Sequence, residues 1–379
     1  MNTGYRFGIE EEFFLADAVT RGTPRRGLKA FHAAVHAKLP QVERELLQAQ
    51  VEIASKPTTR FAEARSALAA LRGGLADIGR AHGILVLASG THPLARWSRQ
   101  RRTEKERYAA ILDEMQMIGR RDVVCGMHVH VEVPRPEDRV DLMNRLLPHT
   151  PLLLALSASS PFWQGRPTGL AAYRLSVWGE MPRTGLPNLY EDAEEYDRYV
   201  ALMTRTGVIK DASFLWWTLR PSIHFPTLEL RVADSCTRLK DALAIAALYR
   251  CLVRFAVRTP DHNRGLTGVS RAVASENLWR AQRSGSRATF IDEAGGGLVS
   301  LPDHLEATLA LVAEDAAALG CETEIEAART IFAQGTSADR QVAVFEQARL
   351  SAAGSLASVA AVVDWLADAT ADRLLDPYR

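Results

Sequence analysis

Four short segments of alternating polar and apolar residues constrain the fold of this chain more than any other feature. Side chains point alternately to the two faces of a β-strand, so each segment predicts a strand with one polar and one apolar face. The segments cover residues 8–13, 48–53, 127–133 and 227–233. Their polar positions are Glu10, Glu12, Gln48, Gln50, Glu52, His128, His130, Glu132, Glu229 and Arg231. The pattern predicts a sheet with one face dominated by carboxylates and imidazoles.

Such a face differs from an ordinary water-facing one, where Thr, Lys, Ser and Gln are usual. Carboxylates that share one face repel each other unless cations neutralise them. We therefore interpret this face as a site for divalent metal, and its carboxylates suit Mg²⁺ or Mn²⁺ better than zinc. A half-exposed sheet, apolar inside and polar outside, is the alternative. Glu11 falls among the apolar positions, so it lies at an edge or is paired.

The remaining periodicity predicts an α+β fold. Alternation indicates strands at 5–16, 47–54, 84–88, 123–133 and 228–232, and 3.6-residue patterns indicate helices at 27–39, 61–83, 103–119, 137–156, 194–207 and 239–258. From about residue 271 the chain is Ala-rich and predicts helices only. We expect a catalytic core over residues 1–265 and a helical C-terminal segment, 266–379, packed on it within one structural domain.

Composition excludes several classes of function. The chain has 379 residues, 47% of them apolar, and a net charge of +1, which argues against binding to nucleic acid or membrane surfaces through bulk charge. Its four cysteines are scattered, and no apolar run has the length of a membrane span or signal peptide. We therefore expect a reduced, cytoplasmic protein.

Five motifs, in order along the chain, carry a resemblance to a known family. They are residues 8–12 (GIEEE), 51–57 (VEIASKP), 90–93 (GTHP), 125–130 (CGMHVH) and 226–234 (PTLELRVAD). Together they resemble the bacterial carboxylate–amine ligases, or glutamate–cysteine ligase type 2 proteins, of the glutamine synthetase superfamily. The match runs from about residue 6 to residue 234, and residues 337–341 (SADRQ) fit more loosely.

The resemblance implies a curved, mainly antiparallel sheet with helices on its outer face, plus a helical C-terminal part. ATP and Mg²⁺ or Mn²⁺ would occupy the concave face, where an amide forms through an acyl phosphate. Glutamate is the expected carboxylate, the amine acceptor is not identified, and a homodimer is expected. The metal ligands or their near neighbours would be Glu10, Glu12, Glu52, His128 and Glu229, and Arg231 would face the phosphates.

Elementary chemistry agrees with this implication. A carboxylate is a poor electrophile until phosphorylation gives it a leaving group, and phosphoryl transfer needs metals and a cation such as arginine. No GxxxxGK[ST] motif is present to bind phosphates. We assign Arg231, Glu52 and Arg220 to catalysis, and Arg231 and Arg174 to binding of the nucleotide or a substrate carboxylate. A surface arginine is the alternative for Arg220 and Arg174.

Several other residues allow two interpretations. Trp216 and Trp217 could stack on adenine or pack in the core, and His92 could shape a turn at the mouth of the site or serve a structural role. Asp234 could orient Arg231, although capping the helix from residue 239 is the safer interpretation. We interpret Cys125 as a small, buried hydrophobic residue.

Two rival functions remain open at this stage. His128-x-His130 alone resembles the paired histidines of metal-dependent amide hydrolases that fold as βα barrels. Those barrels need further metal ligands at the ends of later strands and a parallel βα repeat. A non-catalytic binding protein that kept the fold is the second rival, and the intact set of carboxylates argues against it.

Overall fold

The computed structural model describes residues 4–351 and 354–371. A long central strand, β1 (Phe7–Asp17), organises a seven-stranded sheet in the order β10-β11-β5-β1-β3-β2, with β4 also paired to β1. Every pairing in this sheet is antiparallel. The other strands are β2 (Glu43–Arg44), β3 (Gln50–Ala54), β4 (Ile84–Leu87), β5 (Met127–Glu132), β10 (Leu219–Pro221) and β11 (Thr227–Leu230). The predicted α+β class with a mainly antiparallel sheet is confirmed.

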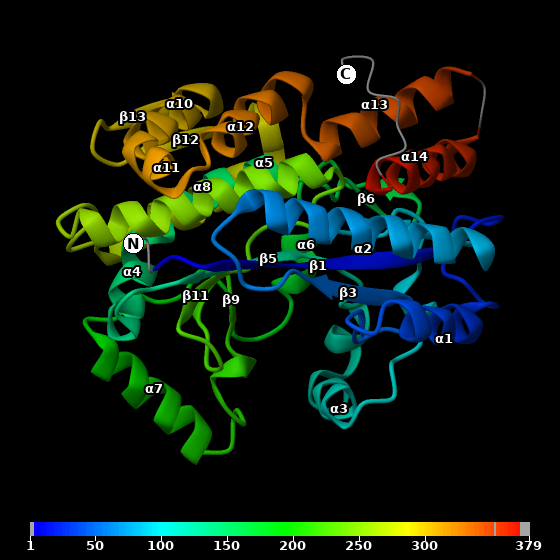
Figure 1. The fold of residues 1–379 in the computed structure, drawn as a ribbon, viewed down its shortest axis with the longest axis horizontal. Coiled ribbons are helices and arrows are strands. Elements are labelled where there is room, and N and C mark those ends of the chain that lie inside the picture. The colour runs from blue at the N-terminus through cyan, green and yellow to red at the C-terminus, as the bar shows by residue number, and fades with distance from the viewer. Residues whose placement is uncertain (1–3, 352–353, 372–379) are drawn as a thin grey trace.

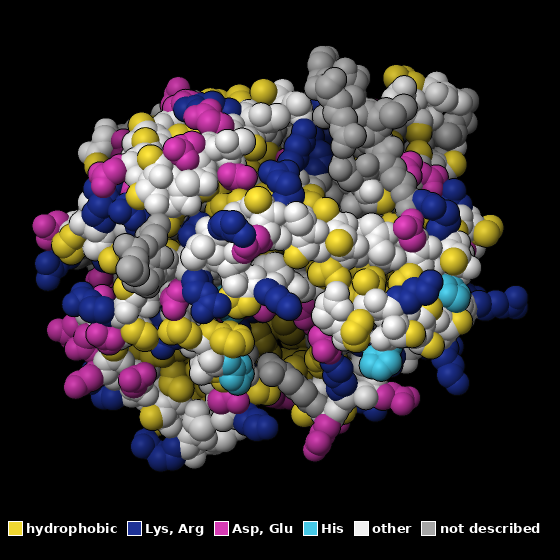
Figure 2. Space-filling view, in the orientation of Figure 1, with side chains coloured by type: hydrophobic (Ala, Val, Ile, Leu, Met, Phe, Trp, Pro, Cys, Tyr) yellow, Lys and Arg dark blue, Asp and Glu magenta, His cyan; other side chains and the backbone are white. Residues whose placement is uncertain are grey.

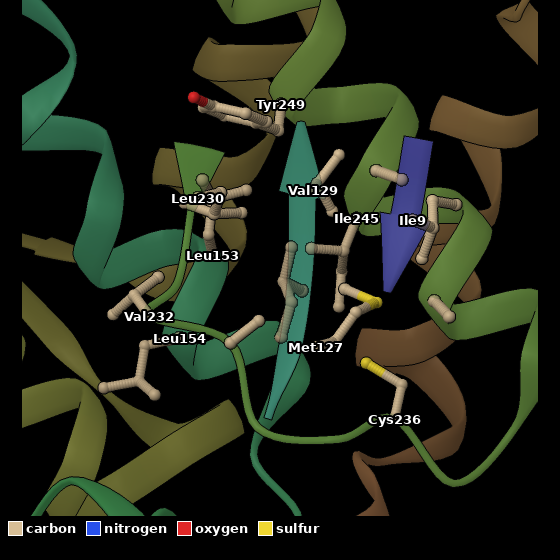
Figure 3. Close-up of a cluster of buried hydrophobic side chains, with 14 of the residues drawn as sticks. Ile9, Met127, Val129, Leu153, Leu154, Leu230, Val232, Cys236, Ile245 and Tyr249 are labelled. Atoms are coloured by element: carbon tan, nitrogen blue, oxygen red, sulfur yellow. The ribbon is translucent and has the colours of Figure 1, made fainter. Parts of the chain in front are cut away.

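The apolar face of the sheet is covered by two helices, α2 (Phe61–Ala81) and α8 (Leu239–Arg258), which lie against it in Figure 1. Ile9, Val129 and Leu230 come from three neighbouring strands and are fully buried. In Figure 3 they lie with Ile245 and Tyr249 of α8. Burial of each such side chain contributes about 1.5–3 kcal/mol. The alternation predicted from the sequence therefore fixes which face receives the helices.

Glu11 lies on this apolar face and is fully buried. Arg72 of α2 donates to it from Nε, at 2.9 Å from Oε2, and also from Nη2. The same guanidinium donates to the carbonyl oxygens of Thr237 and Cys236, each at 2.8 Å. The exception in the alternation is thus a buried ion pair that ties the sheet to α2 and to the segment that precedes α8.

The other helices of the core are α1 (Leu28–Lys38), α3 (Glu106–Arg121), α4 (Arg139–Leu146), α5 (Thr150–Ser157), α6 (Arg174–Trp178) and α7 (Ala193–Arg205). The single helix predicted over 137–156 is wrong, because a 3₁₀ turn at Leu147–His149 separates α4 from α5. Pro148 lies in this turn and Pro151 in the first turn of α5. Proline lacks the N–H that a continuous helix would need.

The C-terminal segment forms a helical layer beyond α8 and α5 (Figure 1). It contains α9 (Gly268–Ser284), α10 (Leu301–Leu311), α11 (Ala313–Leu319), α12 (Glu322–Gln334), α13 (Ser337–Leu350) and α14 (Ser355–Thr370). It is not only helical, however. Strands β12 (Thr289–Asp292) and β13 (Gly297–Ser300) form an antiparallel hairpin, and Gly296 in its turn has a φ of +68°. Gly296 therefore serves a hairpin turn, where a positive φ favours glycine.

Short pairs complete the fold: β6 (Phe162–Trp163) with β7 (Arg166–Pro167), and β8 (Thr184–Gly185) with β9 (Trp216–Trp217). Among the described residues, no helix has the length and apolar character needed to cross a membrane. The division near residue 265 stays a prediction.

Candidate active site

The register of the sheet brings the predicted polar residues into rows. Glu10 of β1 lies opposite His128 of β5, and Glu12 lies opposite Glu52 of β3. On the other edge of β5, His130 lies opposite Glu229 of β11. Directly opposite positions on neighbouring strands hold their side chains in contact range. Residues from four strands that are far apart in sequence therefore meet on one face.

These rows line a cavity of about 470 Å³ on the side of the sheet away from α2 and α8. In Figure 2 the surface is hollowed in this region, between the parts of the chain that carry α3 and α7. All of the predicted site residues border the cavity, namely Glu10, Glu12, Glu52, His128, Arg174, Arg220, Glu229 and Arg231. The structure thus gathers the whole predicted set, and the role of each residue stays a prediction.

Glu10, His128 and Glu229 form the first group of potential metal ligands. One ligand atom from each lies within 4.8 Å of the others. Glu10 Oε2 is 3.4 Å from His128 Nδ1, and Glu10 Oε1 is 3.5 Å from His130 Nε2. Burial lowers the pKa of His128 to about 4, so its imidazole is neutral at pH 7 and keeps a lone pair for a metal.

His130 is a neighbour of this group that the predicted ligand set left out. Burial acts against its charged form, but its contact with Glu10 and the charge of Glu229 raise its pKa. Its Nδ1 lies 2.9 Å from Thr227 Oγ1. Burial likewise opposes ionisation of Glu10, and the two histidines outweigh it and lower the Glu10 pKa. His130 therefore stabilises the charged form of Glu10, a member of the first group.

Glu12, Glu45 and Glu52 form a second, purely acidic group. Burial and the charge of Glu45 raise the pKa of Glu12 to about 8. The Glu52 pKa is raised well above its ordinary value by burial and by Glu45, Glu10 and Glu12. Glu12 and Glu52 therefore resist ionisation, and a bound cation would relieve the repulsion among the carboxylates. All three donate oxygen ligands, so the set fits the predicted Mg²⁺ or Mn²⁺.

Glu45 was missed from the sequence because it lies outside the alternating segments. It follows β2, which pairs with β3 so that Glu43 lies opposite Glu52. The sequence signal was a short acidic segment that ends seven residues before Glu52. Such a segment could form the first strand of a hairpin whose second strand contains Glu52.

Three arginines surround the acidic groups. Arg220 donates to Glu229 Oε2 from Nε at 3.0 Å and from Nη2 at 2.7 Å, and Arg231 donates to Glu229 Oε1. Burial alone would raise the pKa of Glu229, but Arg231 and Arg220 lower it to about 2. Arg174 is 2% exposed and donates to the carbonyl oxygens of Val232 and Arg231. Arg220 therefore holds Glu229 in place, and its donors are committed to the protein.

Asp234 and His92, which each allowed two interpretations, both form contacts within the protein. Asp234 does not cap α8; its Oδ2 accepts from the amide of Ser159 and the hydroxyl of Ser160. His92 is buried away from the cavity, and its Nδ1 accepts from the amides of Leu94 and Ala95, as expected for a structural histidine in a turn.

The adjacent tryptophans take different positions, although both are buried. Trp216 borders the cavity, whereas Trp217 packs against Tyr190, Tyr196 and Tyr199. Only Trp216 is therefore placed where it could meet a ligand. Cys125 is fully buried, as predicted.

Comparisons with known proteins agree with this geometry. The family described as glutamate–cysteine ligase family 2 matches residues 6–362. A protein of Bradyrhizobium sp. (strain ORS 278), provisionally named glutamate–cysteine ligase 2, is 45% identical over 99% of this chain and 90% of its own length. A protein of Rhodospirillum rubrum with the same provisional name is 42% identical over 96% of this chain and 94% of its own length.

Solved structures share the fold at low sequence identity. The glutamate–cysteine ligase of Francisella tularensis in complex with AMP superposes with a TM-score of 0.69 at 12% identity, over 98% of this chain and 90% of that one. The bifunctional glutathione synthetase of Pasteurella multocida also gives 0.69, at 15% identity, over 97% of this chain and 53% of that one.

Proposed function

The chain belongs to glutamate–cysteine ligase family 2, and from this premise we propose how its cavity works as an ATP-dependent ligase that forms carbon–nitrogen bonds. The proposed donor is glutamate, whose side-chain carboxylate is phosphorylated by ATP and then attacked by an amine. Cysteine is one candidate acceptor. The observation that carries this proposal is the convergence of two acidic groups and three arginines in one cavity.

The two acidic groups would hold the divalent cations, Mg²⁺ or Mn²⁺. Glu10, His128 and Glu229 would hold one, and Glu12, Glu45 and Glu52 another. A cation bound there neutralises charge on the phosphoryl oxygens during transfer.

The arginines have separate tasks in this scheme. Arg231 contributes a fixed positive charge beside the first group, where it can stabilise negative charge that develops on phosphoryl oxygens. Arg220 keeps Glu229 ionised and fixes its orientation. Because these charges are anchored before the substrates bind, little reorganisation is needed during the reaction.

A trapping assay tests this function without knowledge of the natural amine. Hydroxylamine captures acyl phosphates as hydroxamates, so purified protein with Mg²⁺, ATP and glutamate should form ADP and glutamyl hydroxamate in equal amounts. Glutamate labelled with ¹⁸O in its side-chain carboxylate should pass one label to the released phosphate, because the bond to phosphorus forms through that oxygen.

A matched pair of variants locates the activity. Glu12→Gln should lower the rate by at least about 100-fold, while Glu132→Gln should leave it unchanged. Glu132 lies on the same predicted polar face of β5, but it does not border the cavity. ADP formation that does not require a carboxylate, or phosphate without the label, would contradict the proposal.

The hydrolase alternative makes the opposite prediction. It requires amide cleavage with metal and no nucleotide. The antiparallel sheet gives this alternative no support, because the paired histidines of such hydrolases belong to a parallel barrel. A panel of amines assayed with glutamate and ATP, with both ADP and product mass followed, then identifies the acceptor.

A further inference from the structure

A second cavity lies beside the end of β1, between the loop that precedes α1 and the segment that follows Leu94. It has a volume of about 940 Å³ and, among the described residues, shares no lining residue with the active-site cavity. In Figure 2, Lys and Arg side chains project at the right edge of the molecule, where Figure 1 shows α1 and the loop before it. Six exposed cations line this cavity, which we call the basic cavity: Arg25, Arg26, Lys29, Arg96, Arg99 and Arg101.

The cations of the basic cavity have no acidic partner on the protein. Within the described part of the chain, no ion pair within 4.0 Å involves any of the six, whereas the exposed Arg329 pairs with Glu306 at 2.6 Å. Asp17 is the one carboxylate among the described lining residues, and its Oδ1 already accepts from the amides of Val19 and Thr20 and from the Thr20 hydroxyl. Positive charges gathered in one hollow repel each other and attract anions.

Hydrogen bonds hold the two cationic segments of the basic cavity in place. Gln100 Nε2 donates to Thr23 Oγ1 at 2.8 Å and to the carbonyl oxygen of Arg96 at 2.9 Å, which joins the loop before α1 to the second segment. The amide of Gln48 donates to the carbonyl oxygen of Arg101 at 2.8 Å. Because the backbone of both segments is fixed before a ligand arrives, binding orders only the side chains.

The start of α1 adds backbone donors to the same wall. The helix begins at Leu28, after Gly27, and no side chain caps it. Both residues line the basic cavity. The first amides of a helix have no partner within the helix, and they carry a partial positive charge that favours a bound phosphate. The amides and the six cations therefore favour the same kind of ligand.

The arrangement of donors favours phosphate over carboxylate. A phosphate group carries about −1.5 to −2 charges on three oxygens, so it accepts from donors on several sides. Here the donors come from two segments and a helix end. A carboxylate is planar and matches a single guanidinium fork. The positive charge is also local, since the whole chain has a net charge of +1, and this differs from the long basic surface that follows a nucleic-acid backbone.

We propose that the basic cavity binds a small anion that carries several phosphate groups. This site is separate from the active-site cavity, and it does not depend on the proposed function. Arginine forks and the first amides of α1 bind the phosphate oxygens. Because the cations are exposed, salt screens the attraction and weakens binding.

Calorimetric titration of the full chain with sodium tripolyphosphate tests the proposal. EDTA is present, so that no metal carries phosphate to the acidic groups of the active site. We expect one site per chain with a Kd on the order of 10 μM at about 50 mM NaCl, weakened at least about tenfold at about 300 mM. The double variant Arg26→Ser/Arg99→Ser should bind at least about 30-fold more weakly. Arg205→Ser/Lys210→Ser is the control, because both residues are exposed and neither lines the basic cavity or the active-site cavity.

Hydrogen exchange of wild-type protein locates the site without any substitution. Tripolyphosphate should slow amide exchange at the start of α1, over residues 28–30, and should leave β5 unchanged. Protection confined to the strands of the active-site cavity would overturn the proposal. So would a Kd weaker than about 1 mM at low salt, or a double variant that binds as tightly as wild type.

Two other ligands test the class of anion. Citrate, which carries three carboxylates, should bind at least about tenfold more weakly than tripolyphosphate, and equal affinity would overturn the assignment to phosphate. A single-stranded oligonucleotide of about 20 residues should bind no more tightly than tripolyphosphate. Tighter binding that is lost in Arg26→Ser/Arg99→Ser would make this wall a nucleic-acid surface and would overturn the proposal.

Discussion

Replacing Glu229 by glutamine should destabilise the protein strongly, even without metal or substrate. Glu229 is 1% exposed and accepts hydrogen bonds from both Arg220 and Arg231. A neutral side chain of the same shape would deprive two largely buried guanidinium groups of the carboxylate charge to which both donate. Removing one partner of a buried ion pair usually costs about 3–5 kcal/mol. We expect a loss in this range for Glu229→Gln.

The titration of Glu229 gives an independent value. Its pKa of about 2, against 4.5 for a free glutamate, corresponds to about 3 kcal/mol of stability at neutral pH. Because the folded-state pKa is the lower one, this contribution is complete above about pH 4.5 and is lost as the pH falls towards 2. The lowered pKa and the loss of a buried ion-pair partner therefore correspond to stability changes of similar size at pH 7.

The measurement is urea denaturation at pH 7 in the presence of EDTA. Wild type, Glu229→Gln, Arg220→Gln and the double variant form a double-mutant cycle, and Glu132→Gln serves as the control for loss of a carboxylate on the same sheet. The double variant should be more stable than the sum of the single losses predicts, by about 1–3 kcal/mol, because it removes one of the uncompensated charges. A loss below about 1 kcal/mol for Glu229→Gln, or strict additivity, would refute the reasoning.

Three further changes have definite expected outcomes. Burial and the charge of Glu45 raise the pKa of Glu12 to about 8, so metal affinity should increase by up to about tenfold per pH unit between pH 6 and 8. The accompanying proton release should be detectable by calorimetry in buffers of different ionisation enthalpy. Glu11→Gln should lower the free energy of unfolding by about 3–5 kcal/mol, measured in urea, because Arg72 remains buried and charged. Gly126→Ala should displace Arg174, because an added Cβ would lie 2.3 Å from its Nη2, and should raise the KM for glutamate by about tenfold or more in the hydroxylamine assay, with a smaller change in kcat.

The sequence predicted those parts of the site that follow from strand periodicity. Alternation requires only local information, and it placed Glu10, His128 and Glu229 on one face before their strands were aligned. The helix over residues 239–258 was also predicted at its observed bounds, because its apolar pattern is long and uninterrupted. Register then brought the three side chains together, which periodicity alone does not determine.

The missed features depend on contacts between distant segments. Asp122 and Glu45 both border the active-site cavity, but Asp122 follows a helix and Glu45 follows a two-residue strand, so neither belongs to a periodic pattern. Asp234 stands near the start of α8 and invites a capping assignment, but its carboxylate is used by Ser159 and Ser160, about 75 residues earlier in the chain. A capping pattern uses only neighbouring residues, whereas a buried carboxylate takes whichever donors the fold brings to it. Asp234 is buried, and its donors come from a distant segment of the chain.

The two groups of potential metal ligands differ in the direction in which the protein shifts the pKa of a carboxylate: that of Glu229 is lowered and that of Glu12 is raised. Glu229 already has its counter-charges in Arg220 and Arg231, so its ionisation stabilises the metal-free protein. At Glu12, burial and the charge of Glu45 outweigh Arg174, Arg231 and the amide of Gly126, and the raised pKa means that the folded protein binds more protons than the unfolded chain between about pH 4.5 and 8. Stability of the metal-free protein should therefore fall as the pH rises through this window, and Mg²⁺ should reverse the fall, because it binds the ionised form. Under the proposed function, the cation would be needed most at Glu12 and Glu52 beside Glu45, while Arg220 and Arg231 hold Glu229 in place without it.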